Sequence, residues 1–155
     1  MRVARVLFEG HPKHCLIYGD QLQVLAGGMD GVEPTGLTIP RSLAEFLPPV
    51  EPTKVLAVLG AFPNGRSREV ARQTGPRFTS KLTSSLIAHR QVIVEPFDTP
   101  YPFDGEAELG VVISRDVRRV DPEDARDAIL GFTLVNDVTL AGQGRQDGDF
   151  LRPPP

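Results

Sequence analysis

Short apolar runs alternate with turn residues over the first 25 positions of the chain. Three segments have the length and the apolar content of β-strands: residues 3–8, 14–18 and 21–25. A turn with one glycine and one proline, residues 9–13, separates the first two, and Gly19-Asp20 forms a two-residue turn between the next two. This pattern predicts a β-meander, followed by a glycine- and proline-rich loop over residues 27–40.

A helix is the next predicted element. Ser42 and Glu45 have the spacing of a capping box, which favours a short helix to about residue 47. Three prolines between positions 48 and 52 then predict a stiff linker. We expect an N-terminal segment over residues 1–52, a main domain over residues 53–146 and a disordered tail over residues 147–155.

The second half again consists mainly of short apolar runs. Strands are predicted over residues 54–59, 91–94, 106–114 and 131–138. One or two helical turns are expected over residues 67–73, and a loop that contains Asp104 over residues 97–104. Asp121 as N-cap and Pro122 at the first helical position predict a helix to about residue 130. The predicted fold is mainly β, in the α+β class, with short helices.

Composition narrows the class of protein. The 15 prolines and 15 glycines suit a fold of many short strands and turns. A net charge of −3 and scattered basic residues argue against a nucleic-acid-binding protein. No apolar run has the length of a membrane span, the first residues do not form a signal peptide, and the single cysteine, Cys15, excludes an internal disulfide. We therefore expect a cytoplasmic protein.

Three carboxylates are candidates for a metal site. Glu106 and Glu108 lie two positions apart at the start of a predicted strand, so both side chains point to the same face. Asp137 lies near the end of the next predicted strand and would join them if the strands are neighbours. Mg²⁺ or Mn²⁺ would offset the repulsion between the carboxylates, because hard cations prefer oxygen ligands. A Glu-x-Glu pair also occurs on solvated strand faces, and the spacing alone leaves that alternative open.

Several segments of the chain carry a resemblance. They include MRVARVLFEG, YGDQLQVL, FLPPVEPTKVLAVLG and, most specifically, DGEAELGVVISRDVRRVDPEDARDAILGFTLVNDVT. Over about residues 1–140 the chain resembles the fumarylacetoacetate hydrolase family. The resemblance implies a β-roll, commonly a dimer, in which Glu106, Glu108 and Asp137 bind Mg²⁺ or Mn²⁺. It also matches Lys81 to a family lysine of catalytic importance.

The resemblance also implies an activity. Members of the family hydrolyse, decarboxylate or isomerise 2-oxo or 1,3-dicarbonyl acids, and the metal stabilises the enolate that develops. The expected partner is such a small carboxylic acid, with no nucleic acid and no membrane.

The chain departs from the family pattern at several points. Glu69 matches a family glutamate, but Arg66 stands where the family has a histidine, and an arginine cannot accept a proton. The substrate-binding arginine and glutamine that follow the metal-binding aspartate in the family are not matched, unless Gln143 or Arg145 substitutes for them, and later strands of the family have no counterpart. Arg66 could instead bind a substrate carboxylate, with a solvated helix face as the alternative.

Two classes of function therefore remain open. The first is a metal-dependent enzyme, with Glu69 and Lys81 as catalytic candidates. The second is a non-hydrolytic member, either a biosynthetic cyclase or isomerase or an inactive partner subunit. We expect a homodimer or larger assembly, in which a separate chain could supply the missing strands. His11 and His14 are expected to be solvated histidines and Cys15 a small core thiol.

Overall fold

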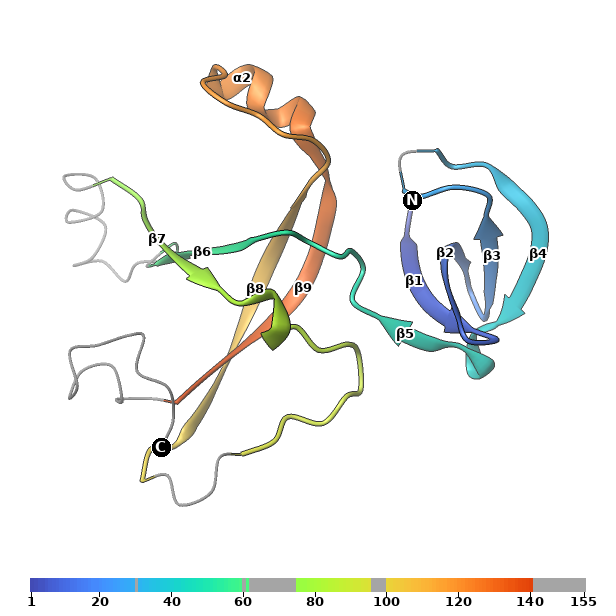
Figure 1. Ribbon diagram of the computed structural model, residues 1–155, viewed down its shortest axis with the longest axis horizontal. Coiled ribbons are helices and arrows are strands. Elements are labelled where there is room, and N and C mark those ends of the chain that lie inside the picture. Colours follow the sequence, from blue (N-terminus) through green and yellow to red (C-terminus); the bar gives the residue numbers. More distant parts are fainter. Residues whose placement is uncertain (30, 60, 62–74, 96–99, 141–155) are drawn as a thin grey trace. The chain divides into compact units, whose positions relative to one another are not determined.

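The computed structural model describes the chain except for residues 30, 60, 62–74, 96–99 and 141–155 (Figure 1). The chain divides into two compact units, Met1–Gln91 and Val92–Pro155. The described residues are mainly β, as the sequence predicts. No helix in them has the length and apolar character needed to cross a membrane.

A five-stranded antiparallel sheet forms most of the first unit. Its strands are β1 (Val3–Phe8), β2 (His11–Tyr18), β3 (Gln21–Leu25), β4 (Pro34–Pro40) and β5 (Glu45–Leu47). They lie in the order β4-β3-β2-β1-β5, and Figure 1 shows the sheet curling strongly. The predicted meander is confirmed, with Gly19 at φ +56° in the tight turn between β2 and β3. Glycine adopts this left-handed conformation without the steric cost that other residues bear.

The core of this unit lies between the curled strands. Four side chains are fully buried: Val6, Cys15, Leu22 and Ile39. Cys15 is thus the core thiol that the sequence predicts. Burial raises the pKa of the Cys15 thiol, with a smaller opposing effect from the positive charge of Lys13. Leu22 pairs directly with Ile39, so β3 and β4 contribute facing side chains to one core.

The segment before Gln91 returns to the same sheet. The rings of His89 and Phe46 meet edge to face with centroids 5.9 Å apart, and the guanidinium of Arg41 lies 5.8 Å from the Phe46 centroid. The buried Arg5 side chain forms an ion pair with Glu51. These contacts of residues 51 and 89 with the sheet extend the first unit well beyond β5.

Three sequence predictions for this unit are wrong. Strand β2 begins at His11 and includes Pro12, which is tolerated because only β1 pairs with this part of β2. Part of the predicted loop over residues 27–40 is β4. The predicted helix is a 3₁₀ turn, Arg41–Leu43, followed by β5. Backbone pairing of β5 with β1 outweighs the local capping-box preference.

A second, two-stranded sheet follows in the chain. Strand β6 (Val55–Leu59) confirms the predicted apolar strand, and it pairs with β7 (Arg77–Lys81), which the sequence pattern does not predict. Residues 91–94 form no strand, contrary to expectation. A 3₁₀ turn, Thr83–Ser85, follows β7. The helical turns expected over residues 67–73 lie outside the described residues.

The second unit is built on a long antiparallel ribbon. Its strands are β8 (Phe103–Ile113) and β9 (Ile129–Leu140), both longer than predicted. Between them, α2 (Pro122–Ala125) begins at Pro122 as expected but continues only as a 3₁₀ turn, Arg126–Ala128. The backbone N–H and the hydroxyl of Ser114 both donate to the Ala128 carbonyl, which closes the connection.

The helices and strands do not test the domain boundaries that we expect from the sequence. The compact units divide after Gln91, whereas we expected a division after residue 52. The tail expected over residues 147–155 lies outside the described part of the chain.

Candidate metal centre

The pairing of β8 with β9 sets the positions of the three candidate ligands. Glu106 lies directly opposite Asp137, and Glu108 lies directly opposite Val135. Because side chains alternate along a strand, Glu106, Glu108 and Asp137 project from the same face of the ribbon. Directly opposite residues have Cβ atoms about 5 Å apart. The expectation that these strands are neighbours is therefore confirmed.

A fourth carboxylate lies on this face. Asp104 belongs to β8, opposite Thr139, and is two positions from Glu106. The prediction that Asp104 is a loop residue is wrong, because β8 begins at Phe103. The period-two pattern of Asp104, Glu106 and Glu108 is a signal that could have placed it. We call the surface formed by Asp104, Glu106, Glu108 and Asp137 the acidic face.

The acidic face is open to solvent. Glu106 is exposed, whereas Glu108 and Asp137 are half-buried. Among the described residues, no three acidic, histidine or cysteine side chains are close enough together to hold a metal ion as they stand. The backbone spacings, about 5 Å across the strands and about 7 Å along one strand, are short enough for side-chain rotation to bring these carboxylates to one ion.

The donor set fits a hard divalent cation. The candidate ligands that the register places on this face are carboxylates, and Mg²⁺ and Mn²⁺ prefer carboxylate oxygens. The opposing residues of β9 on this face include Thr133 and Thr139, and the described part of the face contains no histidine or cysteine that would favour Zn²⁺. Glu106, Glu108 and Asp137 are thus the residues that would hold the ion.

Two glycines of β8 leave room for neighbouring side chains of β9. A Cβ added at Gly110 would lie 2.8 Å from Cγ2 of Thr133 and 3.0 Å from Cγ2 of Val135. Both contacts are on the acidic face, next to Glu108. On the other face, a Cβ at Gly105 would lie 3.1 Å from Oδ1 of Asn136. Side chains of β9 therefore pack over Gly110 and Gly105 in space that a larger residue would fill.

We expect Gly110→Ala to destabilise the second unit by about 1–3 kcal/mol, because the new methyl group would displace Thr133 and Val135. Gly131→Ala is the matched control in the same ribbon, since nothing lies within 4 Å of its added Cβ. That control should be neutral or stabilising by up to about 1 kcal/mol. Urea unfolding of both variants measures the difference. Equal effects of the two substitutions would show that the packing of Thr133 and Val135 over Gly110 does not contribute to stability.

The remaining candidates have different outcomes. Lys81 is the last residue of β7, opposite Val55, and it belongs to the first unit. Glu69 and Arg66 lie outside the described residues. The structure therefore places the three candidate carboxylates on one face of the ribbon, and their assignment as ligands stays a prediction. The catalytic assignments of Lys81 and Glu69 also stay predictions.

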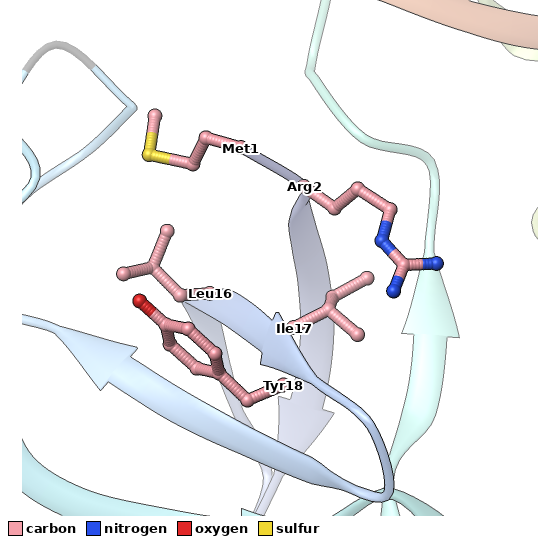
Figure 2. Close-up of a pocket in the computed structure, with 5 residues that line it drawn as sticks. All are labelled: Met1, Arg2, Leu16, Ile17 and Tyr18. Atoms are coloured by element: carbon pink, nitrogen blue, oxygen red, sulfur yellow. The ribbon is translucent and has the colours of Figure 1, made fainter.

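A hollow in the first unit is a separate feature. It has a volume of about 410 Å³ and is lined by Met1, Arg2, Leu16, Ile17 and Tyr18 (Figure 2). Figure 2 shows the Arg2 side chain extending past Ile17 and away from Tyr18. Since its lining is mainly apolar and contains no carboxylate side chain, this hollow does not provide the ligands for a divalent cation.

Comparisons with known proteins identify the class. Residues 56–151 match the family model described as "Fumarylacetoacetate (FAA) hydrolase C-terminal", and residues 1–49 match one described as "Rv2993c-like, N-terminal". An uncharacterised protein of Archaeoglobus fulgidus is 35% identical over 118 residues, which cover 76% of this chain and 47% of that protein. The chain belongs to the fumarylacetoacetate hydrolase family.

Solved structures support the same class. The 5-carboxymethyl-2-hydroxymuconate delta-isomerase of Mycobacterium smegmatis has a TM-score of 0.78 and 27% identity, over 96% of this chain and 59% of that one. The 2-hydroxyhepta-2,4-diene-1,7-dioate isomerase of Mycobacterium marinum has a TM-score of 0.80 and 25% identity, over 96% and 58%. The chain thus has the fold of this family and spans little more than half the length of these relatives.

Proposed function

We propose that the chain is a metal-dependent member of its family that acts on a 2-oxo or 1,3-dicarbonyl acid. The observation that carries the proposal is the register of β8 and β9, with Glu106 opposite Asp137 and Glu108 on the same face. A Mg²⁺ or Mn²⁺ ion bound there would neutralise negative charge that develops on substrate oxygens. Three carboxylate ligands leave about three octahedral positions for water and substrate.

Isomerisation is the reaction that we favour within this class. Two structural relatives are named as isomerases, and each of their names contains a 2-hydroxy-diene-dioate or a hydroxymuconate. A 2-hydroxydienoic acid is the enol form of a 2-oxo acid, so its chemistry is that of the proposed substrate class. Isomerisation moves protons and needs no attacking water. Glu69 and Lys81 are the proposed catalytic residues, and Arg66 is the proposed partner of a substrate carboxylate.

Hydrolysis is expected to be weak for a reason of proton chemistry. Arg66 stands at the position of a family histidine and remains protonated at all ordinary pH values, so it cannot activate water. This observation also favours the second candidate function, a cyclase or an inactive partner subunit. The cytoplasmic location and the homodimeric or larger assembly remain predictions.

Assays of three reactions side by side, each with Mn²⁺, distinguish these functions. We expect isomerisation of a 2-hydroxydienoic diacid or decarboxylation of oxaloacetate to be at least tenfold faster than acylpyruvate cleavage. Glu108→Ala should lower the faster activity on the order of 100-fold, because it removes a metal ligand. Glu123→Ala, on α2, is the control and should leave the activity unchanged.

Efficient acylpyruvate cleavage by the unmodified chain would contradict the expected loss of hydrolysis. If the chain binds Mn²⁺ but turns over none of the three substrates, and Arg66→His restores no activity, the partner-subunit function is favoured. If it does not bind Mn²⁺, the proposed metal chemistry itself is wrong.

A further inference from the structure

Two side chains of β9 pack over Gly110, on the acidic face and next to Glu108. Gly110 lies directly opposite Thr133, and Glu108 lies directly opposite Val135. A Cβ added at Gly110 would lie 2.8 Å from Cγ2 of Thr133 and 3.0 Å from Cγ2 of Val135. The two methyl groups therefore occupy the space that any other residue at position 110 would fill. We call this packing of Thr133 and Val135 over the glycine the Gly110 contact.

The Gly110 contact shows the direction of the Val135 side chain. Val135 is a diagonal neighbour of Gly110 across the ribbon, and such neighbours usually have Cβ atoms about 7 Å apart or somewhat less. Since Cγ2 of Val135 lies only 3.0 Å from the Cβ position of Gly110, this methyl group points toward Gly110 and away from Asp137. A β-branched side chain is stiff about χ1, so the contact fixes the orientation of Val135.

The same methyl groups occupy one side of the space around Glu108. Along β8, the neighbours of Glu108 on this face are Gly110 on one side and Glu106 on the other. A carboxylate that turned toward the Gly110 contact would lose hydration against methyl groups. The other side is polar, because Glu106 and Asp137 lie there directly opposite each other. Glu108 is half-buried, so its neighbours limit its rotamers, and those that remain point toward the other two carboxylates.

We propose that Gly110 and Val135 are positioning residues of the metal centre, whose contact directs the Glu108 carboxylate toward Glu106 and Asp137. This inference rests on the proposed function, because it takes Mg²⁺ or Mn²⁺ to bind on the acidic face. A metal site binds its ion well when packing restricts the rotamers of its ligands in advance. The Gly110 contact acts through shape alone, since the Val135 side chain has no group that binds a cation.

Gly110→Ala should weaken the binding of Mn²⁺ by about tenfold or more, because residues that orient metal ligands commonly have effects of this size. The added methyl group displaces Val135, and since Thr133 already occupies one side of it, the side chain moves toward Asp137. Calorimetric titration of the full chain measures the affinity. The electron paramagnetic resonance spectrum of the bound Mn²⁺ should also change, because its ligand geometry changes. A loss of stability alone would leave that spectrum as it is.

Removing the two methyl groups allows a rescue experiment. The double variant Thr133→Ser/Val135→Ala should weaken Mn²⁺ binding about three- to tenfold, since Glu108 is no longer restrained on that side. Adding Gly110→Ala to this pair puts a methyl group back, and the triple variant should bind Mn²⁺ within about threefold of the unmodified chain. Such non-additivity is typical of residues in contact. Because the double variant only removes bulk, it tests the proposal even if Gly110→Ala alone does not fold.

Gly105→Ala is the matched control in the same strand. Its added Cβ would lie 3.1 Å from Oδ1 of Asn136, on the other face of the ribbon, so it disturbs packing without displacing Val135. It should change the Mn²⁺ affinity less than about twofold, as expected for a site with no shared contacts. Circular dichroism confirms that each titrated variant is folded.

Two results would overturn the inference alone. One is an equal Mn²⁺ affinity of Gly110→Ala and Gly105→Ala, and the other is a triple variant that binds Mn²⁺ no better than Thr133→Ser/Val135→Ala. In both cases the unmodified chain still binds Mn²⁺, so the proposed function stands. If the unmodified, folded chain shows no saturable Mn²⁺ binding, the proposed function is wrong and this inference is overturned with it.

Discussion

Replacing Glu106 with glutamine is expected to weaken Mn²⁺ binding by more than about 100-fold. The substitution keeps the shape of the side chain but removes the charge that lies opposite Asp137. Loss of a mere hydrogen-bonding partner of a metal ligand costs about 10- to 100-fold in affinity, and loss of the ligand charge should cost more. Since Glu106 is exposed, the free energy of unfolding of the metal-free protein should change little.

The matched control for this prediction is Glu123→Gln. Glu123 is also an exposed glutamate of the second unit, but it lies on α2. Calorimetric titration with Mn²⁺ should give the same affinity for this variant as for the unmodified chain. Equal affinities for Glu106→Gln and Glu123→Gln would remove Glu106 from the metal centre.

Replacing Leu22 with alanine is expected to lower the free energy of unfolding of the first unit by about 2–5 kcal/mol. Leu22 is fully buried in the core that also contains Val6, Cys15 and Ile39. Truncation removes apolar contacts and leaves a cavity that the curled sheet can fill only in part. A loss of this size is a large fraction of the stability of an ordinary domain.

An exposed leucine of the same sheet provides the comparison. Leu37 is in β4 and is 47% exposed, so Leu37→Ala should cost less than about 1 kcal/mol. Urea unfolding followed by circular dichroism measures both variants. If the two substitutions had equal effects, the curled sheet would not be the core of the first unit.

The strands that the sequence predicts correctly have a clear apolar pattern. Alternate residues of β1 and of β3 contribute side chains to one core. β8 and β9 are long, so each contains enough apolar residues to be recognised as a strand from its sequence. β4 escapes prediction because Pro34, Gly36 and Pro40 favour a loop, and only one of its residues, Ile39, is buried. β7 is largely polar, and its pairing with β6 is a long-range interaction that local sequence does not encode.

Prediction of the site follows the same division. Glu106, Glu108 and Asp137 could be assigned to one face from two assumptions: side chains alternate along a strand, and two consecutive strands pair with each other. For Asp104 the sequence predicts a loop, because prolines and a glycine lie near it, whereas pairing with Thr139 makes it part of β8. The register itself depends on contacts between strands and had to come from the structure.

The most direct test of the metal centre is calorimetric titration of the metal-free, full chain with Mn²⁺. We expect saturable binding of one Mn²⁺ ion per chain, which Mg²⁺ competes with and which is lost when Glu106 and Asp137 are together replaced by their amides. Binding of Mn²⁺ that survives this double substitution, or no saturable binding by a folded chain, would contradict the assignment of the acidic face as the metal centre.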